Sequence, residues 1–325
     1  MGTVYVVWGS TYLGIRVMVE TVPPLLGAGV RFVAAGALLG AWLTWRGRRT
    51  AGDPATPANP GAGARPRPGL RLDRREAAGA ALVGILLTAG GNGLVTVAER
   101  DIDSSLAALV VASVPLVIVL IRALTGERVG RAALVGVAFG FAGVAILVVP
   151  GAGHRGTGVL GVLLVLAASV SWGTGSVTST RVTLPTDPLV STAVQMTAGG
   201  VVMVLAGLAT GEASGVDPAA LSLRSGLAFG YLVVFGSLAA FTAYAWLLQR
   251  VAISRVSTYA YVNPVIAVAL GWGLLGERIA PTTLAGAAIV VTSVAFIVRS
   301  TRPARPEPPT GATGGAAVAS AARPV

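Results

Sequence analysis

Long apolar runs alternate with short polar segments along almost the whole chain. Ten of these runs are about 20 residues long, which is the length that an α-helix needs to cross the hydrocarbon core of a bilayer. The predicted helices cover residues 3–20, 24–45, 77–98, 104–124, 131–149, 157–180, 188–209, 225–248, 256–275 and 281–299. The pattern therefore predicts an all-α membrane protein with ten transmembrane helices.

Two stretches lack this pattern. Residues 46–75 are rich in Pro, Gly and Arg, and residues 300–325 are rich in Pro, Ala and Gly. Segments of this composition bury too little apolar surface to fold, so we expect a disordered cytoplasmic linker and a disordered tail. Two units of five helices each remain, at 3–149 and 157–299.

The composition supports a lipid environment. Apolar residues make up 54% of the chain and charged residues only 11%, whereas a soluble domain carries about 25% charged residues. There is too little polar material to cover a water-facing surface of this size. The expected partners are therefore the lipid bilayer and a small-molecule substrate.

The basic residues predict an orientation. All of them are arginines, and two, Arg16 and Arg31, lie within helices and are assigned to neither side. With both termini in the cytoplasm, 18 arginines lie inside: Arg46, Arg48, Arg49, Arg65, Arg67, Arg71, Arg74, Arg75, Arg122, Arg128, Arg131, Arg181, Arg250, Arg255, Arg299, Arg302, Arg305 and Arg323. The outside loops hold four: Arg100, Arg155, Arg224 and Arg278. This excess on one side predicts a multi-pass protein of the bacterial inner (plasma) membrane with cytoplasmic termini.

Several functional classes fit poorly. The net charge of +11 does not indicate nucleic-acid binding, because the arginines lie between apolar runs and not on one face. The chain has no Cys, a single His at position 154 and no phosphate-binding GxxxxGK[ST] loop, so we expect no cofactor, no metal site, no ATPase and no enzymatic activity. A channel and a non-transporting scaffold or receptor remain as alternatives to a transporter, and a homodimer is compatible with the sequence.

The two halves begin with similar motifs. The sequence WGST at 8–11 corresponds to SWGT at 171–174. Arg31 lies 23 residues after the first tryptophan, and Gln195 lies 23 residues after the second. The halves therefore share a register as well as a helix count.

The halves also share a motif near their ends. Gly-Glu-Arg occurs at 126–128 and again at 276–278, and a further glycine follows at Gly136 and Gly286 with the same spacing. Because five is an odd number, two five-helix repeats insert into the membrane with opposite orientations. Inverted repeats of this kind are typical of secondary transporters, which bind substrate near the bilayer midplane between the repeats.

A longer series of motifs runs through both halves in a fixed order. The series is Trp8-Gly9-Ser10-Thr11-Tyr12, Pro23-Pro24, Arg31-Phe32, Gly91-Asn92-Gly93-Leu94, Ala98-Glu99, Ser113-Val114-Pro115, Gly126-Glu127, Ala240-Phe241-Thr242-Ala243-Tyr244, Tyr259 to Pro264, and Gly276-Glu277. In this order the chain resembles an EamA-type permease of the drug/metabolite transporter superfamily, with two EamA domains. The resemblance implies ten helices and often efflux of amino acids, metabolites or drugs. We therefore expect an exporter of a small organic metabolite, such as an amino acid or an amphipathic drug, that works by alternating access between the repeats.

Polar and aromatic residues inside the apolar runs are the candidate substrate contacts. They are Trp8, Thr11, Tyr12, Arg31, Asn92, Thr96, Trp172, Gln195, Tyr244, Tyr261 and Asn263. Arg31 lies about 10 Å into its helix, and an ionisable residue at such a depth is costly unless it has a function. Each candidate also has a structural interpretation: an ion pair for Arg31, the interfacial aromatic belt for the tryptophans, and hydrogen bonds between helices for the remaining polar residues.

Charged residues near helix ends leave further alternatives open. Arg16 precedes Glu20 by four residues, so an ion pair between them or snorkelling of Arg16 to the headgroups is favoured over a place in the cavity. Glu127 and Glu277 are expected to cap helices or form ion pairs. Transport is either facilitated exchange or coupled to protons through an edge carboxylate such as Glu20 or Glu99.

Overall fold

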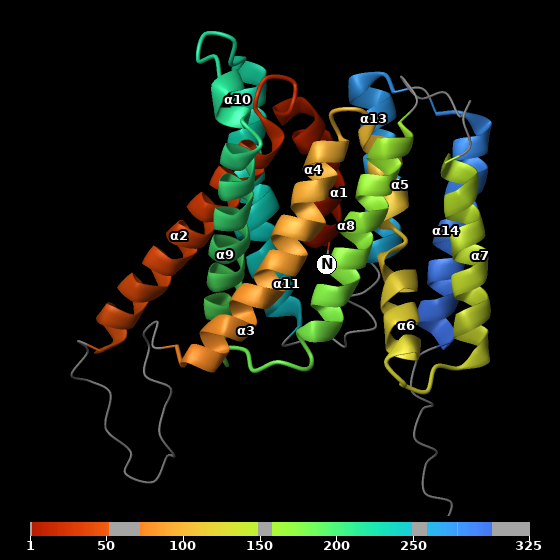
Figure 1. The fold of residues 1–325 in the computed structure, drawn as a ribbon, viewed down its shortest axis with the longest axis horizontal. Helices are drawn as coiled ribbons and strands as arrows, with labels where there is room; N and C mark the ends of the chain where they lie inside the picture. Colours follow the sequence, from red (N-terminus) through yellow and green to blue (C-terminus); the bar gives the residue numbers. More distant parts are fainter. Residues whose placement is uncertain (1, 52–71, 149–157, 249–258, 278, 301–325) are drawn as a thin grey trace, which may run out of the picture.

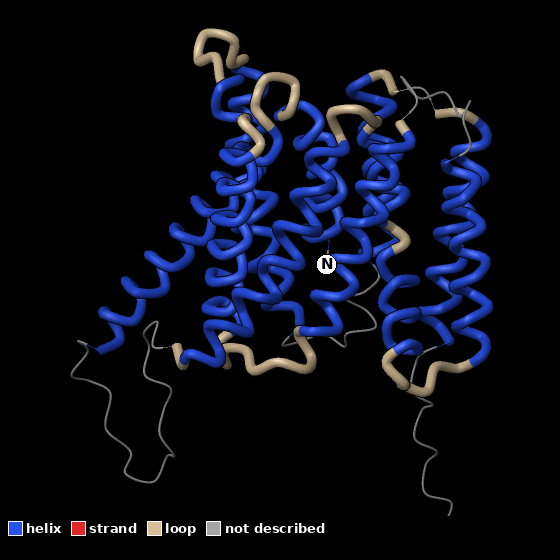
Figure 2. The backbone as a smooth tube through the Cα atoms, viewed as in Figure 1, coloured by secondary structure: helices blue, strands red, loops and turns tan. Residues whose placement is uncertain are grey.

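The protein is all-helical in the part of the chain that the structure describes. This computed structural model describes residues 2–51, 72–148, 158–248, 259–277 and 279–300, and within these ranges it contains no β-strand (Figure 2). Its elements are α1 (Gly2–Met18), α2 (Pro24–Ala51), α3 (Arg74–Gly84), η1 (Ile85–Gly93), α4 (Leu94–Ala98), α5 (Ser104–Val111), α6 (Val114–Leu124), α7 (Arg131–Val148), α8 (Val159–Thr178), α9 (Pro188–Ala209), η2 (Glu212–Gly215), α10 (Leu223–Tyr231), η3 (Leu232–Ala239), α11 (Ala240–Leu248), α13 (Tyr259–Leu275) and α14 (Pro281–Ser300).

Helical structure occupies each of the ten predicted segments, but three of them are subdivided. The third segment runs through α3, η1 and α4, and the eighth runs through α10, η3 and α11. Both η1 and η3 are π-helical, a local widening that is often found at functional sites. The fourth segment breaks between α5 and α6, just before Pro115, because proline lacks the N–H that would continue the helix.

The second helix is longer than predicted. It continues to Ala51, so the first part of the 46–75 segment is helical, while residues 52–71 lie outside the described residues. Arg46 lies over the Trp42 ring at 5.4 Å, and Arg49 lies over the Trp45 ring at 3.9 Å. These cation–π contacts, and the favourable position of cations at a helix C-terminus, explain the extension.

Within the described residues, six helical segments are long and apolar enough to cross a membrane. They are Pro24–Arg49, Arg74–Ala98, Ser104–Leu124, Val159–Thr178, Pro188–Ala209 and Leu223–Ala243, and three shorter apolar helices accompany them. Large apolar side chains on the outside are widely exposed, including Trp272 at 67% and Phe139 at 63%. In water such a surface would aggregate, so lipid is the solvent that fits it.

The helices pack in pairs that correspond between the two halves. Helix α2 lies along α9, and α7 lies along α14 at the opposite end of the molecule (Figure 1). Helix α1 packs against α13 and against the α10–η3–α11 segment, while α8 packs against α5, α6, η1 and α4. If each helix is replaced by its counterpart in the other half, every one of these contacts becomes a contact that is also present in the fold.

Small residues allow the closest of these approaches. A Cβ atom on Gly200 of α9 would lie 2.8 Å from the Val33 nitrogen and 2.9 Å from the Gly29 oxygen of α2. A side chain at this position would therefore push the two helices apart. Gly40, further along α2, faces open space and has no such role.

The glycines that open the two repeated Gly-Glu-Arg motifs have the same left-handed backbone conformation. Gly126 and Gly276 follow the ends of α6 and α13 and have φ angles of 83° and 64°. Left-handed backbone of this kind ends helices and favours glycine. The two turns lie at opposite edges of the fold, between α6 and α7 and between α13 and α14 (Figure 1).

Candidate functional site

Arg31 is buried where α2 meets the π-helical segment η3. Its side chain is only 2% exposed, and its Nε donates a hydrogen bond to the Ser237 Oγ at 3.0 Å. Its guanidinium carbon lies 4.6 Å from the centre of the Phe32 ring. Its Nη1 has no hydrogen-bond partner among the described groups. One donor of this buried cation is thus available to a ligand.

Helix α1 contributes hydroxyl groups beside Arg31. A Cβ atom on Gly236 of η3 would lie 3.0 Å from the Thr11 methyl and 3.2 Å from Arg31 Nη2, so the three groups converge. The Thr11 hydroxyl donates to the Trp8 carbonyl oxygen at 2.6 Å. One residue earlier, the Ser10 hydroxyl and the Tyr231 hydroxyl share a hydrogen bond of 2.5 Å.

Aromatic rings extend this group toward α11 and α13. Trp8 packs edge-on against Phe241 at 5.4 Å and against Tyr259 at 5.2 Å, and Phe241 in turn meets Phe32 at 6.4 Å. Trp8 therefore belongs to the interior of the bundle and not to an interfacial belt. We call Trp8, Thr11, Arg31, Phe32, Ser237 and Phe241 the Arg31 cluster.

Two further predicted residues lie next to the α1 side of this cluster. Tyr12 packs against the large apolar core and interacts electrostatically with Glu99. Asn263 is 7% exposed and, with its amide nitrogen turned toward the main chain, donates to the Tyr259 oxygen at 3.3 Å and the Tyr5 oxygen at 3.2 Å. Its amide thus links α13 to α1, as the structural interpretation predicts.

The remaining described candidates lie at the equivalent place in the repeat, with Trp172 and Gln195 on α8 and α9 of the second half and Asn92 and Thr96 on η1 and α4 of the first. The Trp172 ring of α8 packs against the Gly91 backbone of η1. The Asn92 amide donates weakly to the Leu87 oxygen at 3.5 Å, and the Thr96 hydroxyl donates to the Asn92 oxygen at 2.8 Å. The Asn92 and Thr96 side chains thus bond to main-chain oxygens of their own helical segment and not to another helix.

Gln195, the counterpart of Arg31, also bonds locally. Its amide nitrogen donates to the Ser191 hydroxyl at 2.8 Å, one turn back in α9. An apolar cluster that includes Phe32, Met196 and Met203 lies between α2 and α9. Tyr244 and Tyr261 lie in α11 and α13, but their side chains are outside the described residues. The structure therefore brings Trp8, Thr11 and Arg31 together and places the α8–α9 residues in a separate group.

Arg16 and Glu20 have different partners from those predicted. Arg16 Nη1 donates to the Glu99 main-chain oxygen and, at 3.0 Å, to the Arg100 oxygen. Glu20 lies 3.7 Å from Arg224, and this pair is exposed. Arg16 binds these two carbonyls, which directly follow α4, because carbonyls at a helix C-terminus have no partner within the helix. The expected Arg16–Glu20 ion pair is therefore wrong.

Glu277 holds the N-terminus of α5. One carboxylate oxygen accepts hydrogen bonds from the Ser104 nitrogen at 2.9 Å and its hydroxyl at 2.7 Å. The other accepts from the Ser105 nitrogen at 3.0 Å and from the Ser105 hydroxyl. A carboxylate at a helix N-terminus is stabilised by the unpaired N–H groups and the helix dipole. The predicted capping role is thus what Glu277 performs, across 172 residues of sequence.

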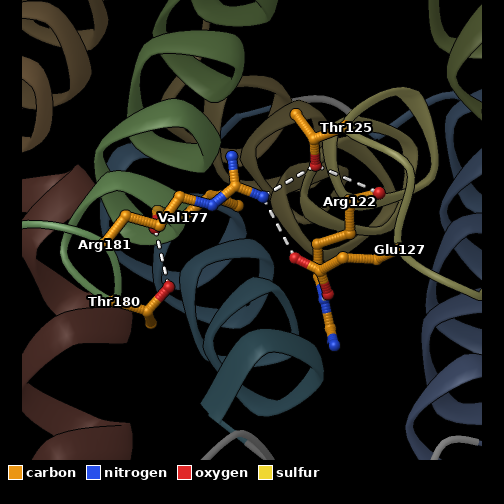
Figure 3. A network of polar contacts seen from close by, with 6 residues as sticks. All are labelled: Arg122, Thr125, Glu127, Val177, Thr180 and Arg181. Carbon is orange, nitrogen blue, oxygen red and sulfur yellow. Dashed lines mark hydrogen bonds and ion pairs between the residues drawn. The ribbon is translucent and has the colours of Figure 1, made fainter.

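Glu127 has the same place in the repeat but a different environment. It is exposed, and it accepts hydrogen bonds from Arg122 Nε at 2.6 Å and Arg181 Nη2 at 3.1 Å (Figure 3). Arg181 also donates to the Thr125 hydroxyl at 2.7 Å. The hydrogen bonds from Arg122 and then from Arg181 lower the pKa of the Glu127 carboxyl below its ordinary value. The two ends of the fold are therefore closed by different contacts.

A surface hollow of about 490 Å³ lies beside Glu277. Its lining consists of Trp272, Gly276, Glu277, Ile279 and Leu284, and it includes none of the predicted substrate contacts whose side chains the structure describes. In this conformation the Arg31 cluster is packed and does not line this hollow.

The sequence prediction omitted four residues of this region. Ser237 and Tyr231 are single polar residues in an apolar run, and Phe32 and Phe241 read as ordinary core residues. A polar group inside a membrane span needs a partner, and this rule applies to Ser237 as it does to Arg31. It could therefore have identified Ser237 as a candidate.

Both halves of the chain match a known protein family. Residues 3–149 and residues 159–299 each match the EamA-like transporter family. The chain belongs to the EamA-like transporter family. It is a membrane transporter, and the two family matches correspond to the two halves in which the repeated motifs occur.

Individual relatives agree with this membership. The uncharacterized inner membrane transporter YedA of Escherichia coli K12 is 40% identical over 294 residues, which cover 90% of this chain and 87% of YedA. A probable amino-acid metabolite efflux pump of the same strain is 27% identical over 300 residues, covering 90% and 91% of the two chains. A crystal structure with 23% identity shares the fold, with a TM-score of 0.57 over 90% of this chain and 93% of its own.

Proposed function

We propose that this EamA-family protein is a secondary transporter that exports a small organic molecule by alternating access between two inverted five-helix repeats, 3–149 and 157–299. All ten helical segments cross the bacterial inner membrane, and both termini lie in the cytoplasm. The observation that carries the proposal is the buried Arg31, which keeps one unpartnered donor where α2 of the first repeat meets η3 of the second. A buried cation with a free donor is costly unless a ligand uses it.

The helix pairing supports the inverted repeat. The packing of α2 on α9 and of α7 on α14 is symmetric under exchange of the halves. The π-helical segments η1 and η3 occupy corresponding segments, the third of each half. Such symmetry is expected when one repeat rocks against the other around a site between them.

The two Gly-Glu-Arg turns support alternating access. Glu277 caps α5 of the other repeat, whereas Glu127 remains exposed and held by arginines of α6 and of the turn after α8. Identical motifs in different environments mean that the repeats have different conformations. Both edges are held by contacts between the halves, and the Glu277 contact is the more buried of the two, so we infer that this edge, which the arginine distribution predicts to be outside, is the more firmly closed.

The Arg31 cluster suggests the class of substrate. A guanidinium donor, two hydroxyls and aromatic rings suit a small amphipathic molecule with an anionic or acceptor group, such as an amino acid or an amphipathic drug. The Escherichia coli relative named as a probable amino-acid metabolite efflux pump is in line with this class and with export.

Counterflow in proteoliposomes tests the proposal. Purified protein is reconstituted, and exchange is measured with labelled amino acids, nucleosides and cationic dyes. We expect exchange of one class, lost in Trp8→Ala and Arg31→Ala but retained in Trp272→Ala and Arg74→Ala, which change exposed residues of the same types. Exchange that survives both cluster substitutions would contradict this site. Dissipation of an ion gradient without any substrate would instead identify a channel.

A further inference from the structure

Almost every acidic side chain in the described helices and turns has an identifiable partner. Glu277 and Glu127 bind the groups given above, and Glu20 lies near Arg224. Glu212 accepts hydrogen bonds from the Leu25 nitrogen at 3.2 Å and the Leu26 nitrogen at 2.9 Å, and so caps α2. These carboxylates hold helix ends or surface ion pairs.

Glu99 is different from these residues. It follows α4, its exposed fraction is 0%, and neither of its carboxylate oxygens has a hydrogen-bond partner among the described groups. A buried anion without hydrogen bonds costs several kcal/mol, about the penalty of an isolated ion after relaxation. A protonated carboxyl avoids this cost, because it carries no charge. The described conformation therefore favours the neutral acid.

None of the described charged and titratable groups around Glu99 donates a hydrogen bond to its carboxyl group. Arg16 of α1 binds main-chain oxygens, including that of Glu99 itself, and Arg31 of α2 binds Ser237. Glu277, a like charge, binds the N-terminus of α5. Tyr12 of α1 is the remaining neighbour that interacts electrostatically with Glu99. Glu99 thus interacts electrostatically with two arginines, but its carboxyl group forms no hydrogen bond with either.

We propose that Glu99 binds and releases the proton that drives export, and that this residue couples the proton to α1 through Arg16. The proposal rests on the transport function proposed above. The reaction is a single proton exchange: the Glu99 carboxylate takes a proton from water to become a carboxylic acid, and later returns it. No other bond forms or breaks.

The position of Arg16 explains how proton release from Glu99 affects the substrate site. With Glu99 neutral, Arg16 binds the carbonyls at the end of α4. Loss of the proton creates a carboxylate on the same residue, and a carboxylate is a stronger acceptor for arginine than a carbonyl. Arg16 then moves toward the carboxylate and shifts α1, which carries Trp8 and Thr11 of the Arg31 cluster. Proton release thereby changes the geometry of the substrate site.

Infrared spectroscopy tests proton binding without any substrate. The protein in detergent is titrated from acidic to alkaline pH, and the C=O stretch of protonated carboxylic acids is followed in difference spectra. We expect a buried acid band that disappears as pH rises, is absent in Glu99→Gln and is unchanged in Glu20→Gln. Such a band in Glu99→Gln, or none in the wild-type protein, would overturn the proposal.

Transport measurements test coupling and separate it from transport itself. With the panel compound that shows counterflow, an outwardly acidic gradient of one pH unit supports about a tenfold concentration ratio for one-to-one exchange. We expect Glu99→Gln to keep counterflow while the ratio falls to about one, and Glu20→Gln to keep both. Glu99→Asp, which retains a carboxyl, is expected to keep a ratio above one if Gln impairs folding.

The outcomes distinguish the two proposals. A full tenfold ratio in Glu99→Gln refutes the proton site and leaves the transporter intact. The absence of counterflow in folded wild-type protein refutes the transporter, while the infrared titration still decides whether Glu99 binds a proton.

Discussion

Replacing Glu277 by glutamine would remove the contact that closes one edge of the bundle. One side-chain oxygen can still accept from Ser104, but the new NH₂ group faces the Ser105 N–H, which loses its acceptor. A buried N–H left unpaired costs about 1–3 kcal/mol. Loss of a negative charge at the α5 N-terminus costs up to about 2 kcal/mol in a partly buried site. The expected destabilisation is about 2–4 kcal/mol.

The effect can be measured as a change in melting temperature and in accessibility. For a chain of this size, the expected loss corresponds to a decrease of about 3–8 °C in the Tm of protein in detergent. Because the natural chain has no cysteine, a single Ser10→Cys substitution beside the Arg31 cluster reports access from the Glu277 edge. A membrane-impermeant maleimide is expected to label this cysteine faster when Glu277 is replaced.

Glu20→Gln is the matched control. Glu20 is also a glutamate, but it is part of an exposed pair at 3.7 Å, and such pairs contribute about 0–1 kcal/mol. We expect its Tm and labelling rate to equal those of the parent protein. If Glu277→Gln melts within about 1 °C of this control, the carboxylate does not hold α5, and the reasoning on the closed edge is wrong.

Three further predictions follow from single side chains. Gly200→Ala should lower the Tm by several degrees, because the added Cβ meets the α2 backbone. Gly40→Ala, where the added Cβ faces open space, should leave the Tm unchanged or raise it. Equal effects of the two substitutions would contradict close α2–α9 packing. Arg31→Met should reduce exchange at least about tenfold. The Tm should stay the same or rise, because an apolar residue replaces a poorly satisfied buried charge. A large fall in Tm would indicate a structural role for Arg31. The pKa of Glu127 is lowered in the folded state, so its contribution is present above its ordinary pKa of 4.5 and is lost as pH falls through the lowered value. The Tm difference between the parent protein and Glu127→Gln should therefore be constant near neutral pH and vanish in acid, and a difference that grows in acid would refute this.

The sequence by itself determined that the apolar segments are helical and which segments of the two halves correspond, although not the break before Pro115 or the extension of α2 to Ala51. Lipid leaves backbone groups no partner outside the segment, so an apolar run of sufficient length must be helical. Glycine tolerates a left-handed turn, which fixed Gly126 and Gly276 as helix ends in both repeats. Both properties depend only on residues close together in the chain, so the pattern of residues within a short segment is enough to predict them.

Only the tertiary structure decided which polar groups meet. Arg31 binds Ser237, which is 206 residues away, and Arg16 binds the end of α4 and not the glutamate one turn along its own helix. The Gly-Glu-Arg motifs that contain Glu127 and Glu277 are identical in sequence, but the two glutamates bind different partners. The physical reason is that a side chain's partner depends on which helix faces it and in which conformation of the repeats. Helical periodicity along one segment carries no information about that face-to-face arrangement.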